Sequence, residues 1–475
     1  MLFQTPTFLI FFLVFLPFYL VARRRHAVPL VVLAASQVFY GWWDWRFLFL
    51  LWTTIFTDFF LAQRVAATDV VWKRKLFLAT SFTISLSLLG FFKYWNFFVA
   101  TAVFARLPGA GAAHIPSLVL PVGISFYTFQ SLSYIFDVYR GVHEPERNLV
   151  TYAAFVSYFP QLIAGPIQRV GHLLPQLVQP APVTVERVLS GLALFAYGFF
   201  LKAVGDAIAQ LINPVFSNLD HAPPSTVVAS IFGFGLQIYF DFNGYSQMAR
   251  GISRVLGIEL TTNFRAPYLA TSFRQFWTRW HITLSQWLRD YVYIPLGGNR
   301  VGSLMRYRNL MLTMLIGGLW HGAGWNFVIW GGLHGTYLVA NTAFDQSWLS
   351  RSAAALPKAL RAGLGWAVTF VGVMYAWLYF RIGTFHGAVT ANRKIYEWLT
   401  SGHLWPWSVP SGLALLVGVV LVIDLVRRNA ADIFPTELVG SRLALAVGGL
   451  AGGFFTVGLI LLAATPAQQF IYFQF

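Results

Sequence analysis

Apolar stretches of about 20 residues, enough to cross a bilayer core of roughly 30 Å, recur along the whole chain and restrict its fold more than any other feature. We expect spans at 3–22, 28–43, 47–63, 76–104, 117–137, 150–165, 187–214, 226–248, 309–344 (long enough for two), 361–383, 409–426 and 441–465. Backbone polar groups must be paired within hydrocarbon, and helices achieve this internally. The sequence therefore predicts an all-α, polytopic membrane protein with roughly a dozen spanning or partly inserted helices.

The composition agrees with a membrane protein and excludes several kinds of chemistry. Of the 475 residues, 57% are hydrophobic and 11% are charged, against about 25% charged in soluble domains. We expect one membrane domain over 1–475, with a motif-bearing core at about 117–345. The chain has no cysteine, which excludes disulfides, thiolate metal sites and acyl-cysteine intermediates. Phosphate-loop, zinc-protease and serine-hydrolase motifs are also missing, so we expect no metal and no tightly bound cofactor.

The basic residues occur in short runs beside apolar stretches and predict the topology. The formal net charge is +16, and basic clusters lie at 23–25, 73–75 and 427–428. Because Lys and Arg are enriched in cytoplasmic loops, we place these clusters in the cytoplasm and both chain ends on the outer, periplasmic side. Charge distributed in this way does not indicate a nucleic-acid partner.

Two connecting regions are unusual. Residues 160–180 carry several prolines and glycines among apolar residues, which predicts a broken helix or re-entrant turn. Residues 272–308 combine six arginines with many aromatic residues and the single acid Asp290. If they form one helix, Trp277, Trp280, Leu284 and Trp287 share a face, as in an interfacial amphipathic helix on the cytoplasmic side.

His321 is the strongest candidate for a catalytic residue. It lies in the sequence GGLWHG at 317–322, within an uncharged stretch where the titratable groups of catalytic type are His321 and His334. The flanking glycines allow close helix approach or a local kink. A near-neutral imidazole can accept the proton of a hydroxyl that attacks a thioester. The alternative is a histidine held by a backbone carbonyl, and for His334 we favour such a packing role.

A second polar group begins at His281. At helical spacing His281, Ser285 and Arg289 share a face that could bind the polar end of an acyl donor. An acyl-serine at Ser285 and an ordinary interfacial histidine are the alternatives.

Asp241 and Asn243 lie in YFDFNGYS at 239–246, inside an otherwise apolar span. A buried carboxylate there needs a cation or donors, such as Arg250 or a histidine. Asp241 could thereby orient a catalytic imidazole, and a purely structural pair is the alternative.

Six motifs in this order resemble the membrane-bound O-acyltransferase family, specifically its bacterial alginate O-acetyltransferase branch. They are LPVGISFYTFQ at 120–130, FPQLIAGPI at 159–167, YFDFNGYS at 239–246, FWTRWHITLSQWLRDY at 276–291, PLGGNR at 295–300 and GGLWHG at 317–322.

The resemblance implies that His321 is the catalytic histidine and His281 a second functional one. It also implies helices around a tunnel through the bilayer, through which a cytoplasmic donor, acetyl-CoA or another acyl thioester, reaches His321. Substrate-binding or supporting roles then fall to Asp241, Asn243, Arg279, Ser285, Arg289, Asp290 and Trp320. The implied partners are membrane lipids, a periplasmic acetyltransferase and a polysaccharide export complex, and the implied location is the bacterial inner membrane.

Two other functions compete with acetyl transfer to an exported polysaccharide such as alginate. A transporter or flippase would use Asp241, His281 and His321 to line a polar path, but we find no internal repeat that would favour it. A non-catalytic membrane scaffold would make substitutions of these histidines silent.

Overall fold

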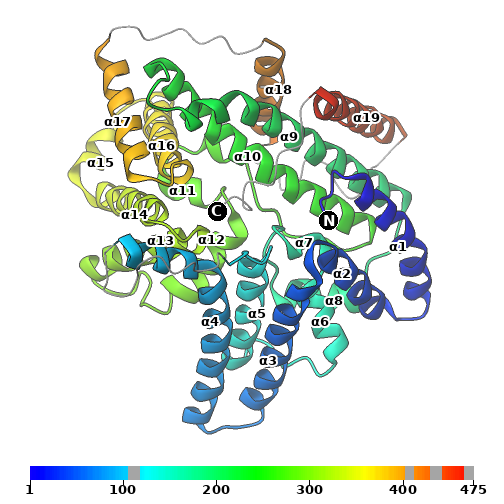
Figure 1. Ribbon diagram of the computed structural model, residues 1–475. Helices are drawn as coiled ribbons and strands as arrows, with labels where there is room; N and C mark the ends of the chain where they lie inside the picture. The colour runs from blue at the N-terminus through cyan, green and yellow to red at the C-terminus, as the bar shows by residue number, and fades with distance from the viewer. Residues whose placement is uncertain (105–117, 402–410, 428–440, 465–475) are drawn as a thin grey trace. The chain divides into compact units, whose positions relative to one another are not determined.

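The computed structural model describes residues 1–104, 118–401, 411–427 and 441–464, and within these ranges the chain forms helices and no strand (Figure 1). The first ten helices are α1 Pro6–Arg24, α2 Val28–Asp44, α3 Leu48–Ala66, α4 Val71–Phe104, α5 Ile124–Tyr139, α6 Leu149–Ser157, α7 Phe159–Leu162, α8 Val170–Val178, α9 Val185–Ser217 and α10 Pro224–Val255. The others are α11 Phe273–Trp277, α12 Ile282–Leu288, α13 Ser303–His321, α14 Trp325–Gln346, α15 Trp348–Ala353, α16 Lys358–Arg381, α17 Phe385–Thr400, α18 Ser411–Arg427 and α19 Ser441–Ala464. The predicted all-α class is confirmed.

Among the described residues, seven helical stretches are long and apolar enough to cross a membrane. They are Pro6–Arg24, Val28–Ala66, Val71–Phe98, Val185–Ser217, Pro224–Val255, Lys358–Arg381 and Ala446–Ala463, with Ser411–Val426 as a shorter apolar helix. Val28–Ala66 covers the two predicted spans 28–43 and 47–63, and each of the other stretches corresponds to one predicted span. Arg428, the second residue of the third basic cluster, lies outside the described residues.

The predicted span at 150–165 is wrong as a single helix, whereas the break predicted at 160–180 is confirmed. The chain forms α6, α7 and α8 there instead. Tyr158 leaves helical geometry at φ −50° and ψ 105°, and Pro160 follows in the first turn of α7. Proline favours the start of a helix over its interior, so the helix restarts at this point.

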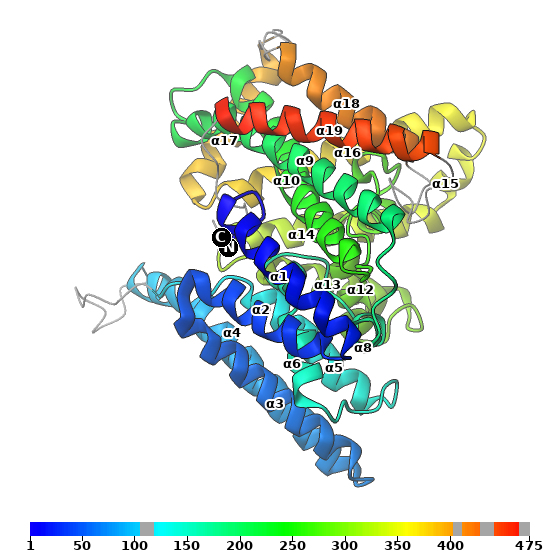
Figure 2. The same cartoon turned by 90° about the vertical axis from the view of Figure 1, so that its right-hand side faces the viewer.

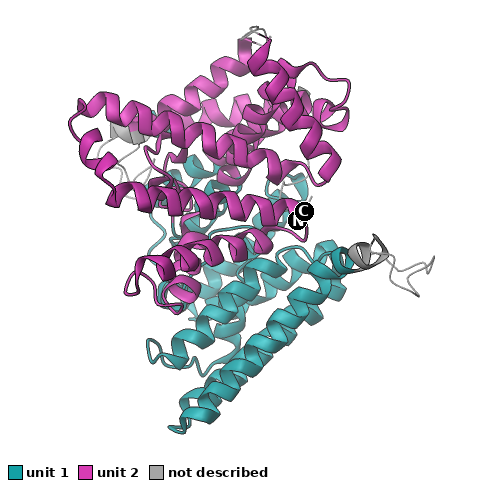
Figure 3. Cartoon of the chain, turned by 90° about the vertical axis from the view of Figure 1, so that its left-hand side faces the viewer, with its two compact units in different colours: residues 1–195, 245–261, 436–448 teal, residues 196–244, 262–435, 449–475 magenta. Residues whose placement is uncertain are grey.

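The chain divides into two compact units, drawn in teal and magenta in Figure 3: residues 1–195, 245–261 and 436–448, and residues 196–244, 262–435 and 449–475. In the first unit α3 and α4 form an antiparallel hairpin (Figures 1 and 2). Asp58 of α3 is fully buried, and its two carboxyl oxygens accept hydrogen bonds from Ser81 of α4 and Ser131 of α5. Ser131 also bonds Tyr152 of α6 at 2.9 Å, so four helices meet at one carboxyl group.

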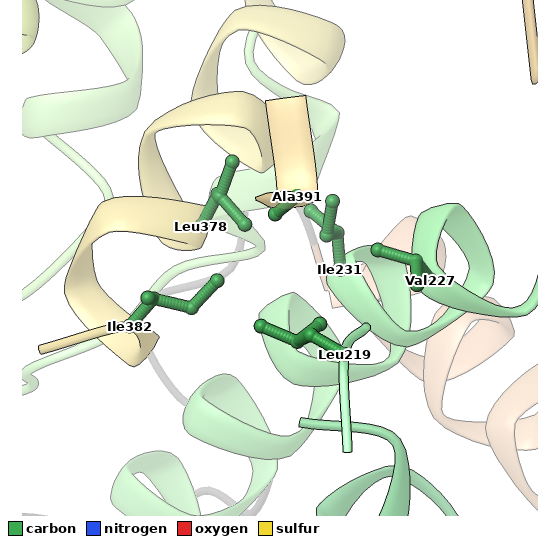
Figure 4. Packing of buried hydrophobic residues seen from close by; sticks show 6 residues of the cluster. All are labelled: Leu219, Val227, Ile231, Leu378, Ile382 and Ala391. Carbon is green, nitrogen blue, oxygen red and sulfur yellow. The ribbon is translucent and has the colours of Figure 1, made fainter. Parts of the chain in front are cut away.

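The parts of α9 and α10 that belong to the second unit, 196–217 and 224–244, run side by side (Figures 1 and 2). Their close approach depends on Gly244, because a Cβ there would lie 2.7 Å from the carbonyl oxygen of Gly198. A separate apolar cluster joins the α9–α10 connection and α10 to α16 and α17 (Figure 4). It contains Leu219, Val227, Ile231, Leu378, Ile382 and Ala391. Its members exclude water from the ends of these helices, which favours their association.

Candidate active site

The candidate active site lies in the second unit, and its first element is the hairpin of α13 and α14. The uncharged stretch predicted to be long enough for two spans forms these two helices, and His321 is the last residue of α13. A Cβ at Gly318 would lie 2.3 Å from the carbonyl oxygen of Phe327, and one at Gly331 would lie 2.5 Å from that of Met314. Gly318 and Gly331 therefore permit the two helices to approach closely. Close approach is one of the two roles predicted for the glycines that flank His321.

Aromatic rings surround the His321 imidazole. Its side chain is buried, and its ring centroid lies 4.9 Å from those of Trp320 and Trp330 and 5.2 Å from that of Phe380. All three rings meet the imidazole nearly edge to face. Such packing restricts the rotation of the imidazole and keeps bulk water away from it.

His281 marks a break in the basic aromatic segment. The single helix predicted for this region is wrong: α11 ends at Trp277 and α12 begins at Ile282. His281 stands between them in the left-handed conformation, at φ 41° and ψ 56°. This conformation is uncommon for a residue with a side chain and persists where neighbouring contacts impose it. The predicted apolar face is nevertheless buried: Trp277, Trp280, Leu284 and Trp287 are at most 9% exposed.

The contacts that hold His281 come from Asn263. The backbone carbonyl of Asn263 accepts a hydrogen bond from Ile282 N at 2.9 Å. Its side-chain oxygen, Oδ1, lies 3.1 Å from His281 Nδ1 and also accepts from the backbone N and the hydroxyl of Thr283, at 3.3 and 3.0 Å. Asn263 therefore binds the two residues that follow His281 as well as the imidazole itself.

The two predicted histidines come together. The ring centroids of His281 and His321 lie 6.5 Å apart, and Trp320 lies beside both, 5.8 Å from His281. Phe242 of α10 packs edge-on against His281 at 4.7 Å. A substrate atom that reached one imidazole would thus be close to the other.

Asp241 takes part in a buried ion cluster. The cation beside it is Lys202 of α9, whose Nζ lies 2.9 Å from Asp241 Oδ1 and also bonds Asp206. These three side chains are 3% exposed. The predicted need for a cation is confirmed, although the sequence prediction did not name Lys202. Asn243, two residues further along α10, is buried as well. The proposed effects of Asp241 and Asn243 on catalysis stay predictions.

A cavity of about 290 Å³ lies between the α11–α12 region and the α13–α14 hairpin. Its polar lining includes Arg274, Ser285 and Arg289, and its apolar lining includes Trp277 and Met314. The size is near the lower end of small-molecule sites, which occupy about 300–1,000 Å³. Ser285 and Arg289, predicted to bind the donor, therefore line the same cavity.

Other predicted residues have partners near this cavity. Arg279 donates to the carbonyl of Ala266 at 3.5 Å and does not belong to the cavity lining. Asp290 accepts from Arg289 Nε at 2.8 Å, an exposed contact that orients the guanidinium. His334 is completely buried among aromatic rings, with Trp330 and Trp277 at 4.7 and 5.0 Å, which agrees with the packing role favoured for it.

Sequence reasoning missed Asn263, Lys202 and Trp330. Lys202 had a recognisable signal, because a lysine and an aspartate four residues later are the charged residues of the otherwise apolar stretch 188–217. Asn263 and Trp330 had none. Their roles depend on which loop or helix face meets the two histidines.

Two buried imidazoles lie together in a protein whose helices are apolar enough to cross a membrane. Comparison with known sequences identifies the class of protein to which this arrangement belongs. A model of the MBOAT, membrane-bound O-acyltransferase family, matches residues 142–382. The chain belongs to this family and is a multi-pass membrane O-acyltransferase.

The chain is also similar to relatives with two different names. It is 40% identical to the probable alginate O-acetylase AlgI of Azotobacter vinelandii, over 80% of this chain and 75% of the relative. The protein of the same name from Pseudomonas putida is 34% identical over 100% of both chains. The peptidoglycan O-acetyltransferase of Helicobacter pylori is 35% identical over 82% of this chain and 78% of its own length.

Proposed function

We propose that this O-acyltransferase moves an acetyl group from a cytoplasmic acyl-CoA across the membrane for the O-acetylation of an exported polysaccharide such as alginate. The names of the relatives support acetyl as the group that is transferred and a polysaccharide as its acceptor. The observation that carries the proposal is the pair of buried imidazoles with ring centroids 6.5 Å apart.

The chemistry needs one proton acceptor at the acceptor hydroxyl. As the hydroxyl oxygen attacks the thioester carbonyl, a C–O bond forms and the C–S bond breaks. The hydroxyl proton passes to the imidazole of His321 and then to the leaving thiolate, which departs as free CoA thiol. If His321 instead carries the acetyl group transiently, the same atoms balance over two steps. His281 orients a substrate, and Asp241 supports the site through the packing of α10.

The donor binds, in this proposal, with its polar end in the cavity beside α12. Arg274 and Arg289 line it and can bind phosphate oxygens, while Trp277 and Met314 offer an apolar surface to the thioester arm. The arginine excess of residues 272–308 places this region on the cytoplasmic side. A tunnel past His321 connects the two faces of the membrane.

The remaining parts of the proposal follow from topology and chemistry. We place the chain in the bacterial inner membrane with both ends periplasmic, because the basic clusters at 23–25 and 73–75 adjoin apolar helices. A polymer outside the membrane requires delivery beyond this chain. A periplasmic acetyltransferase and the polysaccharide export complex are therefore the proposed partners.

The direct test replaces His321 with alanine. We expect His321→Ala to abolish polymer acetylation while the amount of protein in the membrane is unchanged. His221→Ala, at an exposed position between α9 and α10, is the matched control and should keep wild-type acetylation. Normal acetylation by His321→Ala would refute the proposal.

A second experiment separates an enzyme from a transporter. Purified protein in liposomes, together with the periplasmic acetyltransferase, is given acetyl-CoA labelled in the acetyl group, with an alginate oligosaccharide as acceptor. We expect labelled ester on the oligosaccharide, or release of acetate when water is the acceptor, and neither with His321→Ala. Uptake of intact labelled substrate without cleavage of the thioester would instead indicate transport.

A further inference from the structure

The side-chain amide of Asn263 has an orientation that its neighbours determine. The backbone N–H of Thr283 points to it at 3.3 Å, and a backbone N–H can only donate. The amide atom at this position must therefore be the oxygen. The Thr283 hydroxyl, at 3.0 Å, is directed to the same atom.

The orientation of Asn263 determines the tautomer of His281. An amide oxygen only accepts hydrogen bonds, so His281 Nδ1, at 3.1 Å, must carry the proton that is donated to it. A neutral imidazole has one ring proton, and its other nitrogen, Nε2, then carries the lone pair. Burial lowers the pKa of His281 to about 3, so the imidazole is neutral near pH 7.

The backbone reinforces this arrangement. Asn263 O accepts from Ile282 N at 2.9 Å, and Arg265 N donates to Arg279 O at 2.9 Å, so residues 263–265 and 279–282 are joined twice. These bonds keep His281 in its left-handed conformation. The same residue thus fixes both the backbone and the ring of His281.

We propose that Asn263 is a positioning residue that holds His281 as the Nδ1-protonated tautomer, so that Nε2 accepts a hydrogen bond from a second hydroxyl of the acceptor, next to the hydroxyl that attacks the thioester. This inference rests on the proposed function and deepens it, because His281 could otherwise serve the donor or the acceptor. A lone pair can bind a hydroxyl proton, whereas the carbonyl oxygen of a thioester needs a hydrogen-bond donor. His281 therefore belongs to the acceptor side of the reaction.

The ring contacts of His281 agree with such a role. In the described part of the chain, Phe242, Phe264, Trp320 and His321 contact the imidazole. Of these, His321 alone has an ionisable side chain, so it is the group whose charge would influence His281. The hydroxyl next to the one bonded to Nε2 would then lie beside His321, the proposed proton acceptor.

The first test measures the tautomer on the whole protein, without any activity. Nitrogen NMR of protein labelled with ¹⁵N-histidine, with His281→Gln used for assignment, should show a protonated Nδ1 and an unprotonated Nε2. In Asn263→Leu the same signals should change toward a tautomer mixture. A protonated Nε2 in the wild-type protein would overturn the proposal, whatever the fate of the proposed function.

The second test separates the two substrates kinetically. For Asn263→Leu we expect a loss of about 10–100-fold in kcat/KM for an alginate oligosaccharide, as for other residues that orient a functional histidine. The KM for acetyl-CoA should be unchanged. Thr283→Val removes a different bond to the same oxygen and should stay within about 3-fold of wild type. A raised KM for acetyl-CoA with an unchanged acceptor KM would assign His281 to the donor and overturn the proposal.

Asn263→Asp keeps the test decisive if the leucine variant does not fold. A carboxylate still accepts from Nδ1, but its charge raises the pKa of His281. Because the lone pair on Nε2 is lost on protonation, activity of Asn263→Asp should fall on the acid side at a higher pH than in the wild type. An unshifted acid limb, with normal expression, would show that the ionisation of His281 does not matter and would overturn the proposal. If wild-type protein transfers no acetyl group at all, the proposed function fails instead, and the NMR result still decides the tautomer.

Discussion

Lys202 of α9 and Asp241 of α10 form an ion pair of 2.9 Å, and Lys202 also bonds Asp206 one helical turn away. All three side chains are 3% exposed, so little water screens them. Removing one member of a buried pair leaves an uncompensated charge and costs about 3–5 kcal/mol. Lys202 pairs with two carboxylates, so its loss leaves two buried negative charges without this cation. The loss of either aspartate leaves Lys202 with the other one and should therefore cost less.

We therefore expect Lys202→Met to lower the stability of the protein by about 3–5 kcal/mol, because Asp206 and Asp241 lose their shared cation. Asp241→Asn should cost less, since Lys202 keeps Asp206 as its partner. Thermal unfolding in detergent, followed by size-exclusion chromatography, compares the two variants. Equal unfolding temperatures would contradict this expected difference.

Gly318 allows α13 to approach α14. A Cβ on Gly318 would lie 2.3 Å from the carbonyl oxygen of Phe327, which cannot move without displacing the backbone of α14. Such overpacking costs about 1–3 kcal/mol, and it would displace His321 three residues later. We expect Gly318→Ala to lose most acetyl transfer. Gly332→Ala is the control, because a Cβ there would lie 3.9 Å from a Leu315 methyl, an ordinary van der Waals distance. Equal activity of the two variants would show that the approach of the helices does not position His321.

Much of the fold could be predicted from the sequence because hydropathy determines which stretches enter a membrane. The two helices within 309–344 and the broken region at 160–180 follow from length and from proline chemistry. The prediction of a single helix in the basic aromatic segment 272–308 was wrong. The aromatic spacing fits a helix on either side of His281, so the pattern does not show that the chain breaks at this residue. What interrupts the helix is a contact with Asn263, and no local pattern reports that contact.

The candidate site could be predicted from the sequence to a similar extent. His281 and His321 were identified because polar groups in apolar stretches are costly and need a reason to be there. Their partners were not, because Asn263, Trp330 and Phe380 reach the imidazoles through tertiary packing. A sequence shows which polar side chains are unusual within an apolar stretch. Only the arrangement of helices shows what these side chains contact.

Asp58 ties α3 to two neighbouring helices in the first unit. Its carboxyl oxygens each accept from one serine hydroxyl, Ser81 and Ser131. Asp58→Leu would leave both hydroxyls without this acceptor, at about 1–3 kcal/mol for each buried group left unsatisfied. Asp58→Asn keeps one acceptor oxygen and should cost less. The measurement is the temperature of unfolding in detergent, and a leucine variant as stable as wild type would show that these bonds do not hold the helices together.

The cavity beside α12 predicts which arginines bind the donor. Arg274 and Arg289 line it, and an arginine that binds phosphate contributes a charge-assisted, often bidentate, hydrogen bond. We expect Arg289→Ala to raise the KM for acetyl-CoA by about 10–150-fold, since such a bond contributes about 1.5–3 kcal/mol. The KM for the oligosaccharide should not change.

Arg300→Ala is the control for that experiment. Arg300 belongs to the same basic segment but is exposed and outside the cavity lining. Its loss removes the same charge without removing a cavity contact. If both variants raised the KM for acetyl-CoA equally, the net charge of the segment would explain donor binding and the cavity would not.

Burial of His281 also makes stability depend on pH. His281 lies outside the membrane-spanning helices, and burial lowers its pKa from the ordinary 6.5 to about 3. Between these values the unfolded chain binds a proton at this site and the folded chain does not. Stability from this group is therefore complete above about pH 6.5 and is lost at about 1.4 kcal/mol per pH unit as the pH falls toward 3. Unfolding temperatures at pH 5 and pH 7 should differ more for the wild type than for His281→Gln, which has no ionisable group there. An equal pH dependence in the two proteins would mean that His281 is protonated as readily in the folded chain as in the unfolded one.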